Sequence, residues 1–96
     1  MGVMPKRDKT LTDFGRNVSR LRSDAGLSQD KLAEKADLDR TYLSGIERGV
    51  RNPGIKVVIR LARALNVSLD RLCAGILQFK RPARRNESRN PRLDHK

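Results

Sequence analysis

The chain has 96 residues, of which 36% are hydrophobic and only 3% aromatic, and its formal net charge is +11. This length allows one small domain, and the shortage of aromatic side chains favours closely packed helices over a β-sandwich. The single cysteine excludes an internal disulfide and a cysteine-based zinc site. The positive charge predicts a polyanionic partner, nucleic acid or an anionic membrane surface, unless it serves only to keep the chain in solution.

The charge is concentrated at the two ends of the chain. Residues 1–10 carry a net charge of +2 and residues 78–96 a net charge of +5, whereas residues 11–77 are mixed in sign with a net charge of +4. We therefore expect a flexible basic arm at 1–10, a folded domain at 11–79 and a disordered basic tail at 80–96. No apolar run is long enough to span a bilayer and no signal-like start is present, so we expect a cytoplasmic protein.

The folded part begins with apolar residues at helical spacing. A first helix is predicted to start near Thr10 or Thr12, either of which can act as its N-cap, and to end at Gly26. Its inward face would hold Phe14, Val18, Leu21 and Ala25.

Two short helices are predicted next. Ser28 can cap the first of them, and Asp30 lies in its first turn, where a negative charge suits the helix dipole. The apolar pattern stops at residues 37–39, and Asp39 can cap another helix that runs from Arg40 to about Arg48. The inward residues would be Leu32, Ala33 and Ala36 in the first of these helices and Leu43 and Ile46 in the second.

The rest of the domain is predicted to hold two more helices. A loop at 50–54, with the sequence VRNPG, precedes the fourth helix, and Ser68 can cap the fifth. Their apolar faces would be Ile55, Val58, Ile59, Ala62 and Leu65, and Leu69, Leu72, Cys73 and Ile76. We expect Cys73 to be a small core residue. The predicted fold class is all-α, with five helices of roughly 8–13 residues.

The second and third predicted helices are joined by a very short link. Such a link sets the helices at a steep angle, as in a helix-turn-helix, and Ala33 is the small residue that a close crossing needs. When the third helix buries its apolar side, its opposite side presents the polar residues Arg40, Thr41, Ser44 and Arg48, with Tyr42 at the N-terminal end.

These side chains suit the major groove of DNA. Arginine binds guanine O6 and N7 with two hydrogen bonds, and the threonine methyl group contacts the thymine methyl group. Tyr42 fits either a phosphate or base contact or, alternatively, a partly buried packing position beside the turn. The sequence therefore predicts that Arg40 leads a helix that reads base edges.

At this point the sequence resembles the Cro/phage-repressor (Xre) helix-turn-helix family, from about Leu11 to Gly75. GLSQDKLAEKADLDRTYLSGIERG resembles the helix-turn-helix itself, and RLARALNVSLDRLCAG resembles the fourth and fifth helices. The resemblance implies a five-helix phage-repressor-like domain and a regulator of transcription that binds double-stranded DNA. LDRTYLSGIERGVRNPGIK also resembles the controller proteins of restriction–modification systems, although many short Xre regulators share it. Asp37 stands where the family often has glycine, and aspartate tolerates the left-handed conformation.

The resemblance also implies roles for individual residues. It implies that Gln29 braces the DNA backbone at the start of the second helix. It implies that Arg22 and Glu47 form an ion pair between the first and third helices, although a phosphate contact and a surface acid also fit these residues. The implied base-reading positions are Arg40, Thr41, Tyr42 and Ser44, and the implied loop contacts to phosphates or a nearby base are Arg51 and Asn52.

A single reading helix covers few base pairs. We therefore expect a homodimer on a pseudo-palindromic operator whose half-sites lie about 34 Å apart. The candidate interface residues are Leu69, Leu72, Ile76, Leu77 and Phe79, some of which must complete the core. The alternative is a monomer whose apolar patch is covered by the tail. The acidic residues Asp30, Glu34 and Asp37 fit either a contact with RNA polymerase, as in related activators, or ordinary solvated charge, which we favour.

Two other functions compete with gene regulation by this chain alone. One is the antitoxin of a toxin–antitoxin pair, which would also bind a protein toxin, and the other is an adaptor that binds only protein. We do not expect an enzyme, because the single histidine, His95, lies in the basic tail and no carboxylate pair or glycine-rich phosphate loop appears. Accordingly, we expect no catalytic residue, no metal and no cofactor.

Overall fold

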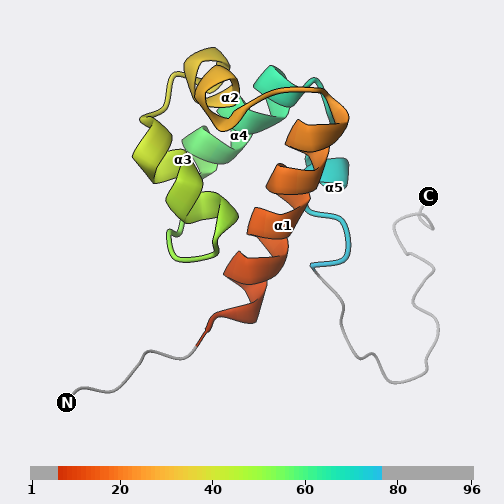
Figure 1. Cartoon of the computed structure of the whole chain (residues 1–96). Coiled ribbons are helices and arrows are strands. Elements are labelled where there is room, and N and C mark those ends of the chain that lie inside the picture. The colour runs from red at the N-terminus through yellow and green to blue at the C-terminus, as the bar shows by residue number, and fades with distance from the viewer. Residues whose placement is uncertain (1–6, 77–96) are drawn as a thin grey trace, which may run out of the picture.

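The computed structural model describes residues 7–76, which form five α-helices (Figure 1). The helices are α1 (Lys9–Asp24), α2 (Gln29–Ala36), α3 (Arg40–Glu47), α4 (Ile55–Leu65) and α5 (Leu69–Leu72). No strand occurs between residues 7 and 76, and α2 and α3 form the predicted helix-turn-helix. The predicted all-α fold class is confirmed.

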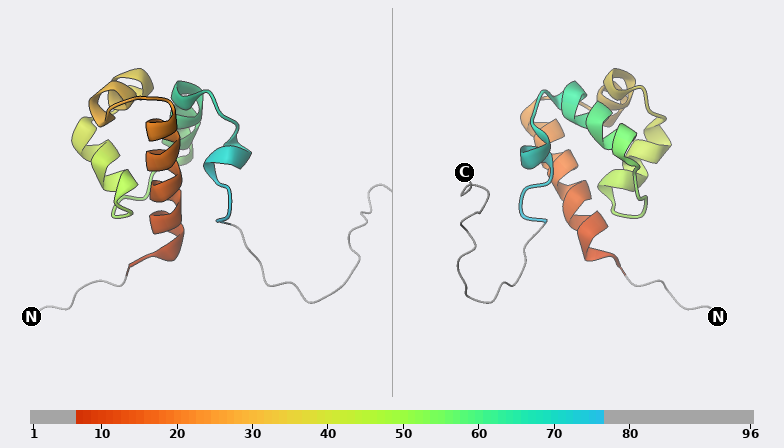
Figure 2. Two further views of the ribbon diagram at one scale, coloured as in Figure 1. Left: turned by 45° about the vertical axis from the view of Figure 1, so that its right-hand side comes forward. Right: turned by 180° about the vertical axis from the view of Figure 1, so that it is seen from behind.

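The long helix α1 lies between two groups of shorter helices. With the molecule turned by 45°, α2 and α3 lie on one side of α1 and α5 lies on the other (Figure 2, left). Contacts join α1 to α3, α4 and α5, and α2 packs against both α3 and α4. The two helices of the helix-turn-helix therefore pack against α1 and α4.

A single apolar core fills the space between the helices. It consists of Phe14, Val18, Leu21, Leu32, Ala33, Ala36, Leu43, Ile46, Leu61, Ala62, Leu65 and Leu72. Each large aliphatic side chain that is fully buried contributes about 1.5–3 kcal/mol to stability. Three residues predicted to face inward do not: Ala25 is exposed at the end of α1, and Ile55 (65% exposed) and Leu69 (43% exposed) begin their helices where no neighbour covers the first turn.

The caps of α2, α3 and α5 are the predicted ones. In each case the cap side chain accepts a hydrogen bond from the backbone N–H three residues later, and the caps are Ser28, Asp39 and Ser68. The start of α1 was predicted wrongly, because Asp8 caps it by accepting a hydrogen bond from the Leu11 N–H at 3.1 Å. The folded domain therefore begins inside the stretch predicted to be an arm at 1–10.

Two helix lengths also differ from the prediction. Helix α1 has 16 residues because Asp8 provides an earlier cap, and α5 has only four. After α5 the chain turns at Cys73, which packs half-buried against the core, and Gly75 adopts a positive φ of 79°. The predicted tail at 80–96, with His95, lies outside the described residues.

A buried asparagine fixes the short α5 to α1. Asn17, which is 5% exposed, donates hydrogen bonds from Nδ2 to the carbonyl oxygens of Leu72 and Ala74, both at 2.9 Å. Its Oδ1 accepts a hydrogen bond from Arg20 at 3.0 Å. These bonds satisfy the buried amide and the free carbonyl groups at the end of α5.

Candidate nucleic-acid interface

Helix α3 has one buried side and one exposed side. Leu43, Gly45 and Ile46 are buried, whereas Arg40, Thr41 and Arg48 are exposed and Ser44 is half-buried. Because the apolar residues are buried in the core, the opposite, polar side of the helix faces solvent. The predicted outward side of the helix is therefore available to a ligand.

Helix α3 lies unusually close to α1 because residue 15 is glycine. A Cβ atom added at Gly15 would collide with the backbone carbonyl oxygens of Ile46 and Glu47. The sequence prediction missed this contact and named only Ala33, which is buried in α2. A glycine in the middle of a predicted helix was the available signal.

The buried side of α3 is also held by an ion pair. Arg22 of α1 donates from Nε to Glu47 Oε2 at 2.7 Å and from Nη2 to Glu47 Oε1 at 3.0 Å. The Arg22 side chain is 17% exposed and the Glu47 side chain 5%. The hydrogen bond with Glu47 raises the pKa of Arg22; burial opposes this shift and Coulombic attraction reinforces it. Arg22 also donates from Nη1 to the carbonyl oxygen of Leu27 at 2.9 Å.

Gln29 joins this ion pair from the first turn of α2. Its Nε2 donates to Glu47 Oε1 at 2.9 Å, so Glu47 receives hydrogen bonds from both α1 and α2. One carboxylate at the end of α3 thus fixes three helices relative to one another. The side-chain amide of Gln29, which is predicted to contact the DNA backbone, thus also makes a contact within the protein.

Arg40 lies at the other end of α3 in a different environment. Its Nε is 3.2 Å from Asp30 Oδ1 in α2, and the two side chains are 59% and 80% exposed. An exposed ion pair of this kind is worth about 0–1 kcal/mol and is weakened by salt. Arg40 is therefore held only weakly, and its guanidinium group remains accessible to an external ligand.

The other residues predicted to contact DNA lie in different environments. Tyr42 is half-buried and packs against the core, as its alternative interpretation stated. Arg51 is an exposed residue whose side chain lies against Gly45, where an added Cβ would come 2.5 Å from Arg51 Cγ. Asn52 is exposed in the same loop. The loop after α3 thus places Arg51 against the helix at Gly45 and leaves Asn52 exposed.

Arg60 of α4 fixes the turn of the helix-turn-helix. It donates from Nε to the carbonyl oxygen of Ala36 at 3.0 Å and from Nη2 to that of Asp37 at 3.2 Å. Asp37 adopts the predicted left-handed conformation, with φ 58° and ψ 50°. Sequence reasoning missed Arg60, and the only signal was a charged residue inside the apolar run from Val57 to Ala62.

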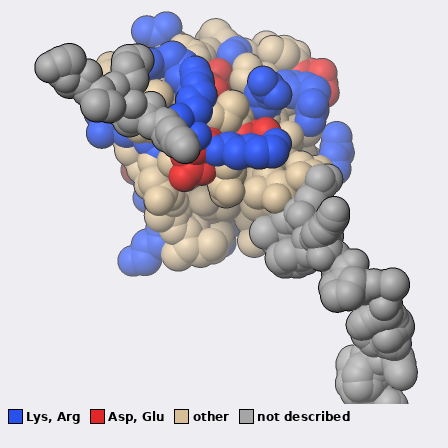
Figure 3. All heavy atoms as spheres, turned by 90° about the horizontal axis from the view of Figure 1, so that it is seen from below, with Lys and Arg blue, Asp and Glu red and all other residues tan. Residues whose placement is uncertain are grey.

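Basic side chains cover part of one face of the molecule. Seen from below, Lys and Arg gather along one half of the face with a few acidic groups between them, and the other half is mostly uncharged (Figure 3). Within residues 7–76 no cluster of His, Cys, Asp and Glu could hold a metal ion. No helix in the same part of the chain is long and apolar enough to cross a membrane.

Comparison with known proteins identifies the class. The helix-turn-helix family model matches residues 18–72, which is more than half of the chain. The chain belongs to this family, and it is a helix-turn-helix regulator of transcription that binds DNA.

The relatives that it matches include control proteins. The chain is 46% identical over 55 residues to control protein C.BamHI of Bacillus amyloliquefaciens, covering 56% of this chain and 68% of that protein. It is 40% identical over 73 residues to control protein C.SmaI of Serratia marcescens, covering 72% and 87%. The crystal structure of the restriction–modification controller protein C.AhdI from Aeromonas hydrophila superposes with a TM-score of 0.66 at 40% identity, covering 68% of this chain and 98% of that one.

Proposed function

We propose that this protein is a sequence-specific regulator that binds an operator as a homodimer and controls a restriction–modification system. The observation that carries the proposal is the outward polar side of α3, held in place by the contacts of Glu47 with Arg22 and Gln29. A rigidly mounted helix loses little freedom on binding, which favours recognition of a defined sequence. The likeness to C.BamHI, C.SmaI and C.AhdI supports the controller role.

In this proposal α3 enters the major groove with its N-terminal end toward the bases. Arg40 binds guanine O6 and N7, and Thr41 and Ser44 make shorter contacts to neighbouring base edges. Arg48 and Arg51 bind the flanking phosphates, which fixes the register without reading sequence. Gln29 acts mainly by holding Glu47, and the backbone N–H groups of the first turn of α2 face the DNA backbone.

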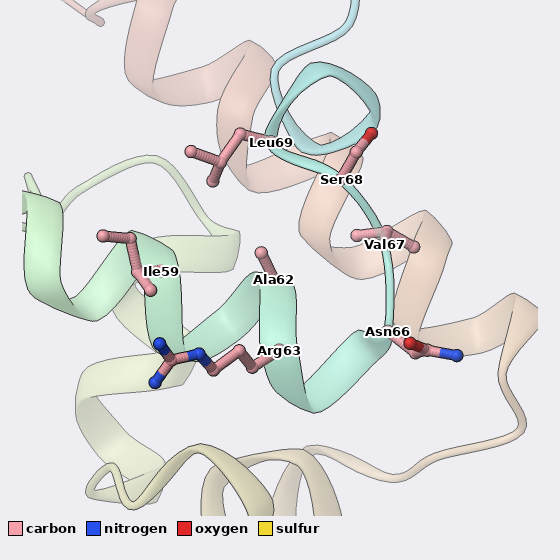
Figure 4. A pocket seen from close by; sticks show the side chains of 7 residues that line it. All are labelled: Ile59, Ala62, Arg63, Asn66, Val67, Ser68 and Leu69. Carbon is pink, nitrogen blue, oxygen red and sulfur yellow. The ribbon is translucent and has the colours of Figure 1, made fainter.

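The dimer surface is proposed at the corner between α4 and α5. Leu69 lies there in an open hollow with Ile59 and Val67 (Figure 4). Among the candidate interface residues, of which some were expected to complete the core, Leu72 is fully buried and is one that does so. Ile76 is half-buried on another part of the surface. Leu77 and Phe79 lie outside the described residues.

We further propose that the protein acts in the cytoplasm, without catalysis of its own, and that the tail at 80–96 adds salt-sensitive contacts to phosphates. For Asp30, Glu34 and Asp37 we favour ordinary solvated charge over a contact with RNA polymerase. Asp30 pairs with Arg40, and Glu34 lies 3.4 Å from Lys31 Nζ, so two of the three carboxylates have partners within the domain.

Selection of binding sites from random duplex DNA by the full-length protein tests the main proposal. We expect one enriched sequence made of two inverted half-sites whose centres lie about 34 Å apart. Enrichment of no sequence would contradict base reading, and enrichment of one isolated half-site would contradict the dimer.

Sedimentation of a Leu69 variant tests the dimer surface. We expect Leu69→Glu to shift the protein toward the monomer, because a charge would be buried at the interface. Val50→Glu is the control, since Val50 is also an exposed large apolar residue (58% exposed) but lies after α3. Dimers of unchanged stability in Leu69→Glu would place the interface elsewhere.

A further inference from the structure

We propose that Asp30 is a positioning residue that sets the base preference of Arg40. The proposal rests on the proposed base reading by α3 and adds a determinant of specificity on α2. Asp30 lies in the first turn of α2 and Arg40 is the first residue of α3, so the pair joins the two helices on their exposed side.

The geometry of the pair leaves the reading end of Arg40 available. The closest approach is between Arg40 Nε and Asp30 Oδ1, at 3.2 Å. A guanidinium group has five N–H donors in one plane, and four of them are on the two terminal nitrogens. The carboxylate therefore approaches the guanidinium group at Nε, and the terminal nitrogens lie farther from it. Its charge favours orientations of the plane that keep Nε toward α2 and leave the terminal nitrogens able to bind two acceptors.

This orientation favours guanine over other targets. Bidentate binding of O6 and N7 requires the guanidinium plane to match the plane of the base, and a long side chain pays less entropy when it is already oriented. A phosphate accepts a cation in many orientations and gains little from such alignment. Asp30 should therefore strengthen binding of Arg40 to guanine and give no comparable gain at a phosphate.

The charge of Asp30 acts in the opposite direction on unselected DNA. Its carboxylate is 80% exposed beside the proposed interface, so it repels phosphates and competes with them for Arg40. Glu34 lies one turn further along α2 and is similarly exposed (74%), but its partner is Lys31 of the same helix. Glu34 thus has the charge of Asp30 without the contact to Arg40.

This difference allows a matched test with the full-length protein. Affinities of Asp30→Asn and Glu34→Gln are measured for the selected operator and for a random duplex of the same length. We expect both variants to bind the random duplex more tightly, because each loses one negative charge. Only Asp30→Asn should bind the operator more weakly, by roughly two- to fivefold, the range typical of an exposed ion pair. Equal effects of the two variants on the operator would overturn the proposal.

The Arg40→Ala background shows whether Asp30 acts through Arg40. There, Asp30→Asn should no longer weaken operator binding and should behave like Glu34→Gln. If the weakening persists without Arg40, Asp30 contacts the DNA or alters the fold, and the proposal is wrong.

Base preference provides a readout that a general loss of stability would not change. Site selection with Asp30→Asn should relax the preference at the same position that Arg40→Ala relaxes, and leave the other positions unchanged. Retention of the full preference at that position would contradict the proposal. If the unaltered protein selects no sequence, the proposed function fails first; selection by the unaltered protein combined with an unchanged Asp30→Asn profile overturns only the role of Asp30.

Discussion

One arginine–carboxylate pair lies at each end of α3. The two pairs use the same chemical groups but differ in burial and in geometry. Arg22 and Glu47 form two hydrogen bonds at 2.7 and 3.0 Å and are 17% and 5% exposed. Arg40 and Asp30 make one contact at 3.2 Å and are 59% and 80% exposed. Water and external anions have little access to the first pair, whereas both can reach the second pair.

This difference distinguishes the pair that holds α3 in place from the pair that is proposed to take part in DNA recognition. A buried pair is costly to break because the remaining charge stays in a poorly solvated site. An exposed pair contributes little to stability, because water and ions compete for both partners. The helix can therefore be fixed at its C-terminal end and open to a ligand at its N-terminal end, although the same side-chain types are used at both.

Removal of the buried carboxylate should produce the largest effect. We expect Glu47→Ala to lower the free energy of unfolding by about 3 kcal/mol, because Arg22 and Gln29 lose their shared acceptor. Chemical denaturation with urea measures this change. Asp30→Asn is the matched control and should change the free energy by less than about 1 kcal/mol. Similar losses in the two variants would show that the pairs are equivalent.

The close contact of α1 with the buried side of α3 should be the next most sensitive point. We expect Gly15→Ala to lower the free energy of unfolding by about 1–3 kcal/mol, because its Cβ must push the carbonyl groups of Ile46 and Glu47 away. Displacement of Glu47 would also weaken operator binding. Thermal unfolding and operator titration measure the two effects.

Gly54→Ala provides the control for this substitution. A Cβ added at Gly54 meets nothing within 4 Å, and its φ of −76° suits any residue. Its stability should stay within about 1 kcal/mol of the unaltered protein, since the loss of a favourable cap residue and the reduced freedom of the unfolded chain oppose each other. Tolerance of alanine at position 15 to the same degree would contradict the tight helix contact.

Sequence reasoning succeeded where the determining interactions are local. Ser28 and Asp39 cap helices through bonds to residues only three positions away, and the outward side of α3 follows from the spacing of Leu43 and Ile46. It was wrong at the start of α1, where two threonines offered caps but Asp8 provides one earlier.

Contacts between distant segments were the ones that local patterns missed. Gly15 and Arg60 act on backbone carbonyl groups more than twenty residues away, and no periodicity in either helix indicates that target. Asp30 was noted only for its favourable place in the helix dipole and as part of an acidic group. Its contact with Arg40 depends on how α2 and α3 pack against each other, which the sequence pattern does not show.

The most direct test of the account compares specific and unspecific binding by Arg40 variants. Arg40→Ala should lose about 1–3 kcal/mol of binding free energy on the selected operator and much less on random DNA. Arg40→Lys keeps the charge but not the two aligned donors, so it should also lose affinity mainly on the operator. Arg16→Ala, which removes an exposed arginine from α1, controls for charge. Equal losses of Arg40→Ala on both DNAs would show that Arg40 contacts only phosphates and would contradict base reading by α3.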